Sequence, residues 1–279
     1  MLHDFLRAIG AGRVKTGIKL TIARHRDALP IRLLHQAATF IEQAHANEGA
    51  DFATNGEQEL LSKLKQADFR TAIDVGANRG DWSIAAMSTW PNCRVHAFEV
   101  APNTFRELQA SIRATRYSDR IVMNDFGVSD GSGTRTMYYY PNMPEFTGEA
   151  RRHADQEAIP FEARLSTLDA YCVEQGIDHV NFLKVDVEGA EHRVFKGFSE
   201  FLKGKLVDCI QFEYGAFSIE TRFLLADYFS MLSDRYWMGK IYPKYVDFRE
   251  YNWQMENFKF CNYICVSRNR PDLKKLLEA

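Results

Sequence analysis

No long uninterrupted run of apolar residues occurs in this sequence of 279 residues. A membrane-spanning helix needs about 20 consecutive apolar residues, and a signal peptide needs a shorter apolar run after a basic start. The first 30 residues, which read MLHDFLRAIGAGRVKTGIKLTIARHRDALP, contain charged residues throughout and fit neither pattern. We therefore expect no transmembrane segment and a cytoplasmic location.

Cysteines are few and odd in number. The five are Cys93, Cys172, Cys209, Cys261 and Cys265, and no two have the C-x-x-C spacing of zinc or redox sites. Most of them lie in apolar surroundings. This pattern is typical of buried, reduced thiols in a reducing compartment and gives no indication of a disulfide framework.

A large excess of charge of either sign is also missing. Lys and Arg total 35 and Asp and Glu total 37, which gives a net charge of -2. Nucleic-acid-binding domains usually carry a strongly basic surface, so we expect no nucleic acid partner. The apolar fraction of 46% is sufficient for a sizeable core, and the length suits one large α/β domain with an extension.

The N-terminal segment is the exception to this balanced charge. Its basic residues are Arg7, Arg13, Lys15, Lys19, Arg24, Arg26 and Arg32, against only Asp4 and Asp27. Such a segment is suited to an anionic membrane surface or to a partner, including another copy in an oligomer, but a solvated helical extension is the simpler interpretation. Residues 31–46 have the apolar spacing of a helix. We divide the chain into a helical extension, residues 1–54, and a domain, residues 55–279.

Strand and helix patterns alternate through the domain. Expected strands are residues 71–75, 94–99, 120–126, 180–185, 207–213, 235–242 and 259–267. Expected helices are residues 57–65, which follow a possible capping box at Thr54-Asn-Gly-Glu57, and residues 81–89, 102–114, 167–175, 190–196 and 218–233. Such alternation predicts an α/β fold with a doubly wound, mostly parallel seven-stranded sheet.

Two segments depart from the alternation. Residues 131–165 are rich in Gly and Pro and contain Tyr138-Tyr-Tyr140, so we expect an inserted hairpin and loop. The last two strands are close in sequence, which favours an antiparallel hairpin at the edge of the sheet. We expect the insert and the loop 241–258 to build the pocket for a substrate molecule, called the acceptor below. Its aromatic surface would come from Tyr138, Tyr139, Tyr140, Tyr245, Phe248, Tyr251 and Trp253.

The strongest motif is Ile73-Asp-Val-Gly-Ala-Asn-Arg-Gly-Asp81. Gly76 and Gly80 frame a turn from strand to helix, where backbone amides can receive an anionic group. Asp74 is placed to favour an ammonium group. A dinucleotide site prefers a glycine where Asn78 stands, which argues against an NAD-dependent oxidoreductase. A glycine turn required only for packing remains the alternative interpretation of this motif.

Two further acidic motifs follow strand ends. Glu99 closes the second strand about twenty residues after the glycine turn, where an acid accepts the hydroxyls of a ribose. Asp186 ends the fourth strand within Leu183-Lys-Val-Asp-Val-Glu-Gly-Ala-Glu191, and ligands of such sheets bind at these ends. Surface ion pairs are the alternative for Lys184 and Glu191.

These motifs together resemble the FkbM family of methyltransferases. The matching pieces are Asp-Val-Gly-Ala-Asn-x-Gly at 74–80, Ala-Phe-Glu at 97–99, Thr-Leu-Asp at 167–169 and the segment 183–191. The resemblance implies the Rossmann-like class I methyltransferase fold, S-adenosylmethionine as cofactor, and O-methylation of a hydroxyl on a sugar, glycan or related natural product.

The resemblance also implies site residues. The cofactor set is Asp74, Gly76, Asn78, Gly80, Glu99, Asn124, Asp125, Gly127 and Asp186, with the turn 127–129 beside the adenine. Asp186 and Glu188 would face the methyl group and a small-molecule or glycan acceptor.

An alcohol acceptor benefits from a base that takes its proton, for which Asp186, Glu188 and His192 are the candidates. A solvent-facing position is the alternative for His192. Asp186, Glu188 and Glu213 are also candidates for binding a divalent metal that orients a diol, although the sequence alone identifies no metal site. A non-catalytic cofactor-binding module is a third possible function besides the transferase and the oxidoreductase.

Overall fold

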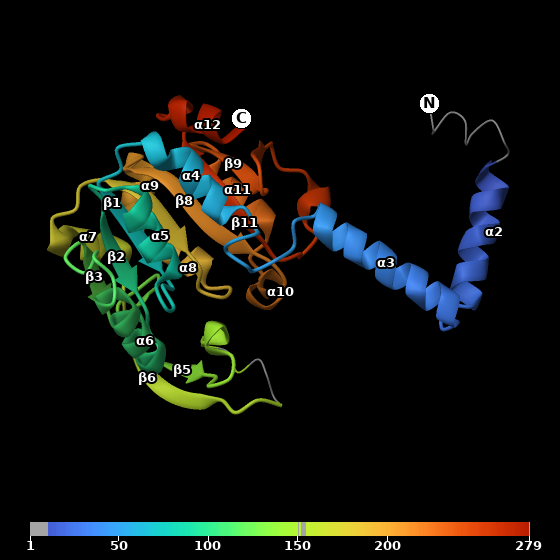
Figure 1. Ribbon diagram of the computed structural model, residues 1–279, viewed down its shortest axis with the longest axis horizontal. Helices are drawn as coiled ribbons and strands as arrows, with labels where there is room; N and C mark the ends of the chain where they lie inside the picture. The colour runs from blue at the N-terminus through green and yellow to red at the C-terminus, as the bar shows by residue number, and fades with distance from the viewer. Residues whose placement is uncertain (1–10, 150, 152–154, 279) are drawn as a thin grey trace. The chain divides into compact units, whose positions relative to one another are not determined.

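The computed structural model describes residues 11–149, 151 and 155–278 (Figure 1). The chain separates into two compact units, residues 1–48 and residues 49–279. The first ten residues of the expected helical extension lie outside the described part.

The described part of the first unit, residues 11–48, contains two helices, α2 (Ala11–Arg24) and α3 (Leu29–His45). This confirms the helix expected over residues 31–46. Pro30 stands in the first turn of α3, where its fixed backbone angle suits a helix start. No residue of α3 is buried. None of the described helices is both long and apolar enough to cross a membrane.

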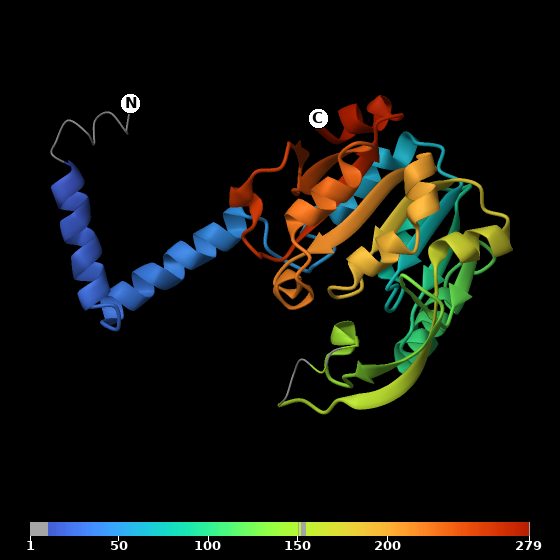
Figure 2. The ribbon, with the colours of Figure 1, turned by 180° about the vertical axis from the view of Figure 1, so that it is seen from behind.

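The second unit is built on a large twisted sheet, which confirms the doubly wound α/β fold (Figures 1 and 2). The strand order is β10-β9-β11-β8-β7-β1-β2-β3. Neighbours from β8 to β3 run parallel, whereas β11, β9 and β10 pair antiparallel. The strands are β1 (Thr71–Val75), β2 (Arg94–Phe98), β3 (Ile121–Asn124), β7 (Val180–Val185), β8 (Val207–Tyr214), β9 (Tyr236–Ile241), β10 (Val246–Phe248) and β11 (Cys261–Ser267).

The sheet therefore has eight strands where the sequence pattern predicted seven. The additional strand is β10, a three-residue segment within the expected loop, which pairs with the outer edge of β9. So short a segment has no readable alternation. The expected antiparallel hairpin of β9 and β11 is confirmed.

Helices cover both faces of the sheet. On one face, apolar side chains of α7 (Leu168–Gln175), α8 (Glu191–Lys196), α9 (Ser199–Gly204) and α11 (Leu225–Leu232) join one core cluster. On the other face, α4 (Glu57–Lys63), α5 (Asp81–Thr89), α6 (Pro102–Arg113) and α12 (Pro271–Glu278) join a second. A short 3-10 helix, η1 (Leu64–Gln66), follows α4, and η3 (Trp253–Met255) lies in the loop before β11. Every residue of β8 is buried, as expected for a parallel strand covered on both faces.

All five cysteines are buried and free, in agreement with the expectation of reduced thiols. Burial raises the pKa of Cys93 to about 12, so its thiol stays protonated.

The helix predicted over residues 218–233 is two helices, α10 (Phe217–Thr221) and α11. Arg222 adopts a left-handed conformation with φ of 55°, which ends α10. The carboxylate of Asp227 accepts the Leu224 backbone N–H at 2.7 Å and so marks the start of α11. The apolar spacing continues across this break, and for that reason the pattern did not reveal it.

The predicted capping box at Thr54 is wrong in its capping residue. The Thr54 hydroxyl donates to Asp51 at 2.9 Å, while the side-chain oxygen of Asn55 accepts the Glu57 backbone N–H at 3.0 Å. Helix α4 begins at Glu57, one turn of chain after the predicted cap.

The insert forms a small separate sheet, and its predicted hairpin is confirmed. Strands β5 (Gly133–Tyr139) and β6 (Ile159–Ser166) are antiparallel, and β4 (Gly127–Val128) adds to β6 in parallel. The short 3-10 helix η2 (Pro144–Phe146) lies between β5 and β6.

Candidate active site

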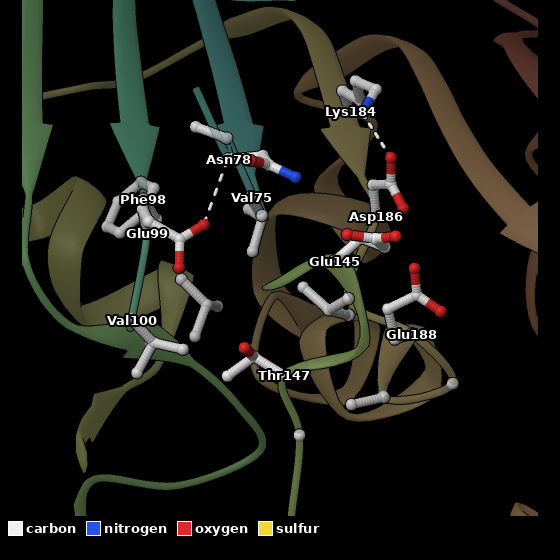
Figure 3. A pocket seen from close by; sticks show the side chains of 18 of the residues that line it. Val75, Asn78, Phe98, Glu99, Val100, Glu145, Thr147, Lys184, Asp186 and Glu188 are labelled. Atoms are coloured by element: carbon white, nitrogen blue, oxygen red, sulfur yellow. Dashed lines mark hydrogen bonds and ion pairs between the residues drawn. The ribbon is translucent and has the colours of Figure 1, made fainter. Parts of the chain in front are cut away.

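A cavity of about 830 Å³ lies at the carboxyl ends of β1, β2 and β7 (Figure 3). Its walls come from the loops that follow these strands, from β4, from the insert, from α10 and from residues 50–57. Ligands of doubly wound sheets bind at this edge, and the volume lies in the upper range of small-molecule pockets.

The loops after β1 and β7 are packed against each other at Gly76. Gly76 has φ of +84°, and a Cβ added there would stand 1.8 Å from the carbonyl oxygen of Asp186. The Asp186 backbone N–H donates to the carbonyl of Val75 at 2.9 Å. Only glycine fits this crossing, and both Gly76 and Asp186 line the cavity.

Gly80 has a packing role instead. It precedes the first residue of α5 with φ of +91°, and an added Cβ would stand 2.7 Å from a methyl group of Leu108 on α6. It is absent from the cavity wall. The structure therefore places the two glycines of the motif in different surroundings, one at the cavity and one between helices.

Asp74 lies beneath the cavity wall. It is fully buried within β1, and one carboxylate oxygen accepts the Ser83 hydroxyl at 2.6 Å. Burial raises the pKa of Asp74, and the nearby Lys184 ammonium opposes that shift. This contact ties the first turn of α5 to the strand, so Asp74 shapes the motif without lining the cavity.

Glu99 directly follows β2 and faces the cavity with a fixed carboxylate (Figure 3). One oxygen accepts the Asn78 backbone N–H at 3.0 Å, and the other accepts the Ala101 backbone N–H at 2.8 Å. Burial raises the pKa of Glu99 to about 7, although both amide hydrogen bonds lower it. The side chain is therefore oriented before any ligand arrives.

The residues expected beside an adenine separate into two groups. Gly127 lines the cavity together with Val100 and Ser129. Asn124 and Asp125 do not line it. The Asn124 amide donates to the Ala97 carbonyl at 3.1 Å, and Asp125 pairs with Arg164 at 3.2 Å.

Lys184 and Asp186 form a partly buried ion pair with an N–O distance of 2.7 Å (Figure 3). Burial lowers the pKa of Lys184, but the carboxylates of Asp186, Asp74 and Glu57 raise it by more. Lys184 is therefore charged and only 6% exposed, so the alternative of a surface pair is wrong for this residue.

Glu191 is also internal. It is 2% exposed, and one carboxylate oxygen accepts the backbone N–H groups of Val187 and Gly189, each at 3.1 Å. These bonds hold the turn that carries Glu188, whose φ is 54°. The alternative of a surface pair is therefore wrong for Glu191 as well.

Three carboxylates converge at the ends of β7 and β8. One oxygen each of Asp186, Glu188 and Glu213 lie within 4.8 Å of one another. Asp186 and Glu188 line the cavity, while Glu213 lies behind them in β8 and is 7% exposed. Burial raises the pKa of Glu213, and the charges of Asp186 and Glu188 raise it further.

His192 lines the cavity on the first turn of α8. Its ring stacks on Phe223 with centroids 4.9 Å apart. Burial lowers the pKa of His192, and the charges of Lys196 and Arg193 lower it further. The imidazole is therefore neutral near pH 7 and not simply a solvent-facing helix residue.

The insert contributes a polar wall. Glu145 and Thr147 line the same cavity as Asp186 and Glu188 (Figure 3). Glu149 also lines it, and its carboxylate pairs with Arg193 of α8 at 2.7 Å and with Arg135 of β5 at 2.8 Å. The pair with Arg193 connects the insert to the helix that carries His192.

The aromatic residues expected to form the acceptor pocket do not line the cavity. Among the described residues, the cavity wall includes none of the seven aromatic residues named from the sequence. Tyr139 and Tyr140 are buried, Tyr245 stacks on Tyr242, and Tyr251 packs on Phe229. The loop 241–258 follows β9 and contains β10, and these strands form the opposite edge of the sheet from β2 and β3.

Residues 74–238 match the Methyltransferase FkbM domain, which is more than half of the chain. The chain belongs to the FkbM methyltransferase family. Membership confirms the resemblance drawn from the motifs.

Several curated proteins share this FkbM region. Methyltransferase sdnD of Sordaria araneosa is 28% identical over 155 residues, which are 46% of this chain and 60% of that protein. The 31-O-demethyl-FK506 methyltransferase FkbM of Streptomyces tacrolimicus is 30% identical over 158 residues, 46% of this chain and 59% of that protein. The 2-O-methyltransferase NoeI of Sinorhizobium fredii is 25% identical over 158 residues, 52% of this chain and 63% of that protein.

This chain spans about three fifths of the length of these relatives. Among solved structures, a methyltransferase FkbM from Methylobacillus flagellatus KT aligns with a TM-score of 0.44 and 18% identity. That alignment covers 71% of this chain and 44% of the other.

Some residues that line the FkbM cavity were missed from sequence. Phe52 and Glu57 come from the segment just before β1, and Glu220 and Thr221 come from α10. The charge of Glu57 at a helix start looks like an ordinary first-turn acid, and only its 5% exposure reveals an internal position. No local motif marks these positions.

Proposed function

We propose that this protein transfers the methyl group of S-adenosylmethionine to a hydroxyl oxygen of a sugar, glycan or related natural product. The observation that carries the proposal is one cavity with a fixed, buried acid at one side, Glu99, and the polar group of Asp186, Glu188 and His192 at another. The names of two relatives, a 31-O-demethyl-FK506 methyltransferase and a 2-O-methyltransferase, support transfer to oxygen.

The cofactor would lie along the ends of β1 and β2. Glu99 would accept the ribose hydroxyls, Val100 and the turn at Gly127 would border the adenine, and the loop of Gly76 and Asn78 would hold the methionine portion. The fixed orientation of Glu99 supports this arrangement, because no reorganisation of its carboxylate is needed on binding.

The oxidoreductase alternative fits this loop less well. Asn78 has φ of 47° and lines the cavity at the position where a dinucleotide motif has a glycine. Its side chain occupies space that a pyrophosphate needs for close approach to the backbone. A non-catalytic module would not need the three acids and the neutral histidine gathered at the other wall.

When bound, S-adenosylmethionine supplies a methyl carbon to which the acceptor oxygen bonds while the carbon–sulfur bond breaks and its electron pair stays on sulfur. Asp186 and Glu188 would orient the acceptor hydroxyl in line with that carbon, a role that supplies several kcal/mol in well-oriented reactions. His192 would take the hydroxyl proton, since its lowered pKa keeps the ring neutral and able to accept.

The acceptor would occupy the part of the cavity beside the insert. Glu145, Thr147 and Glu149 offer hydrogen-bond acceptors and one hydroxyl there, which suits a molecule rich in hydroxyl groups. This wall favours a sugar-like acceptor over a flat aromatic one.

Calorimetry with S-adenosylhomocysteine and with NAD tests the cofactor assignment. We expect S-adenosylhomocysteine to bind and NAD not to bind, and Glu99→Ala to bind S-adenosylhomocysteine more weakly. Binding of NAD alone would overturn the proposal, as would a Glu99→Ala protein with unchanged affinity. A screen of hydroxylated acceptors with methyl-labelled S-adenosylmethionine then tests the acceptor class.

The N-terminal helices favour a second role, contact with an anionic membrane surface. Val14, Ile18 and Ile22 recur every four residues on α2 and are each 45% exposed or more. Lys15 and Lys19 flank this apolar row. Apolar residues between lysines are typical of helices that lie in the interface of anionic lipids.

A further inference from the structure

We propose that Asp186, Glu188 and Glu213 bind one divalent cation of the Mg²⁺ or Ca²⁺ type, and that this cation chelates two neighbouring oxygens of the acceptor. The first part stands on the carboxylates alone. The second part rests on the proposed methyl transfer and narrows its acceptor to a molecule with vicinal oxygens.

The spacing of the three carboxylates suits such an ion. Their nearest oxygens lie within 4.8 Å of one another. Ca²⁺ binds oxygens at about 2.3–2.6 Å and therefore spans oxygens up to roughly 5 Å apart, while Mg²⁺ at about 2.0–2.1 Å requires a small closure. Carboxylate oxygens are the ligands that both ions prefer.

The second observation is an unsatisfied acid at the centre of the group. Glu213 is 7% exposed, and its Oε2 atom has no hydrogen-bond partner in the part of the chain that the structure describes. Two other buried acids at the cavity, Glu99 and Glu191, each accept two backbone amides, whereas Asp74 beneath the wall also leaves one oxygen without a donor in the described residues. A buried carboxylate oxygen without a donor needs a cation or a proton.

The local charge balance favours a cation. The Lys184 ammonium contacts Asp186 at 2.7 Å through one carboxylate oxygen. The charges of Asp186, Glu188 and Glu191 all act on Glu213, so several carboxylates gather at this ammonium. A divalent ion would compensate the remaining negative charge without displacing Lys184.

The position relative to the cavity gives the ion access to a substrate. Asp186 and Glu188 line the cavity, and Glu213 lies behind them. An ion held by all three would have protein on one side and open coordination positions on the cavity side. Two adjacent oxygens of an acceptor would fill these positions and replace two waters.

The ion would also ease loss of the hydroxyl proton. An oxygen bound to a divalent ion is more acidic, so the proton leaves more readily to His192. The oxygen then forms its bond to the methyl carbon, the carbon–sulfur bond breaks, and the electron pair leaves with sulfur. One proton and one S-adenosylhomocysteine result for each methylated oxygen.

Direct binding of Mn²⁺, followed by electron paramagnetic resonance on the full chain without cofactor, tests the site. We expect one Mn²⁺ per chain and at least tenfold weaker binding in Glu213→Gln and in Glu188→Gln. The matched control is Glu200→Gln, an exposed acid on α9 paired with Lys203, which should bind Mn²⁺ as the unaltered protein does. Mg²⁺ and Ca²⁺ should compete with Mn²⁺, and each should raise the melting temperature of the unaltered protein but not of Glu213→Gln.

Each other outcome overturns the proposal. No Mn²⁺ binding by the folded protein would show that the acids share protons instead. Binding that survives both substitutions would place the ion elsewhere. If Glu213→Gln does not fold, Mn²⁺ binding by Glu188→Gln, which changes a half-buried residue, tests the site by itself.

Failure of the proposed transferase function is separable, because S-adenosylhomocysteine calorimetry measures that function without metal. Intact Mn²⁺ binding together with absent cofactor binding would leave the metal site standing and remove only its role toward the acceptor. Activity on a vicinal diol that is unchanged by EDTA would likewise remove that role.

Discussion

The α-carbon of Gly76 faces the carbonyl oxygen of Asp186 at a separation that leaves no room for a side chain: an added Cβ would stand 1.8 Å from that oxygen. This contact joins the loop after β1 to the loop after β7, to which we assign the cofactor and the acceptor respectively. The distance between the two loops is therefore fixed by backbone packing.

Gly76→Ala should destabilise the fold and disable the site together. The positive φ and the clash with Asp186 together cost at least about 2 kcal/mol of unfolding free energy. Chemical denaturation measures this loss, and calorimetry measures binding of S-adenosylhomocysteine. Gly131→Ala is the matched control, because an added Cβ there meets nothing within 4 Å, and it should change stability by less than about 0.5 kcal/mol.

Cofactor affinity should depend on pH through Glu99. Its pKa of about 7 means that the carboxylate is mostly protonated at pH 6 and mostly ionised at pH 8. Ribose hydroxyls donate more strongly to the ionised form, so affinity for S-adenosylhomocysteine should rise up to about tenfold from pH 6 to pH 8.

Two substitutions separate this effect from other titrations. Glu99→Gln cannot ionise, so its affinity should be weak and flat across the same range. Glu99→Ala should lose about 1–3 kcal/mol of binding at pH 8. An unaltered pH dependence in Glu99→Gln would show that another group titrates.

His192→Ala should lower turnover by roughly 10²–10⁴-fold while leaving cofactor affinity unchanged, as expected for removal of a general base. Because burial lowers the pKa of His192, the ring is neutral and active above that pKa, and turnover should fall only as pH drops below about 6.5. The pH profile of turnover checks this. Phe223→Leu removes the stacked ring but keeps the imidazole, so it should retain most of the activity.

The insert should determine acceptor binding without affecting the cofactor. Glu145→Gln with Thr147→Val removes one charge and one hydroxyl from the acceptor wall and should raise KM for the acceptor several-fold at unchanged affinity for S-adenosylhomocysteine. Thr136→Val with Glu162→Gln is the matched control, since these two exposed residues bond each other on the small sheet, outside the cavity wall. Equal effects of both pairs would count against an acceptor role.

Vesicle binding should depend on the lysines of α2. Co-sedimentation with vesicles that contain phosphatidylserine should detect the unaltered protein, and Lys15→Glu with Lys19→Glu should abolish that binding by reversing two charges. Vesicles of phosphatidylcholine alone should bind neither protein. Lys203→Glu with Lys205→Glu controls for charge reversal elsewhere. If the altered protein still sediments, these lysines do not mediate binding; if the unaltered protein does not sediment, the membrane role is wrong, and gel filtration then tests an oligomer.

The sequence predicted structure well where several local patterns agreed. The alternation of strand and helix patterns predicted a doubly wound, mostly parallel sheet, and acids at strand ends predicted Glu99, Asp186 and Glu188 at one cavity. These predictions depend on local chain direction and on the general property that parallel strands end at the same edge.

Local patterns do not predict contacts between segments that are far apart in the sequence. Asp74 lies within β1, and Glu99 directly follows β2. Asp74 nevertheless accepts a hydrogen bond from Ser83 beneath the cavity wall, while Glu99 faces the cavity. Glu57 reaches the cavity because α4 packs beside the sheet, and no nearby residue indicates it. The aromatic residues predicted a sugar-binding surface, but Tyr139 and Tyr140 are buried, and Tyr245 and Trp253 are exposed outside the cavity wall.

The insert has a consequence for how acceptor preference can diverge. One wall of the cavity is encoded within a single continuous stretch, residues 131–165, whereas the wall proposed to hold the cofactor is encoded by the strand ends of the large sheet and by the turn at Gly127. Recombination or loop replacement within that stretch can change which molecule is modified and leave the methyl donor site untouched. A chimera that exchanges this one segment between two relatives should therefore inherit the chemistry of its scaffold and the acceptor preference of its graft.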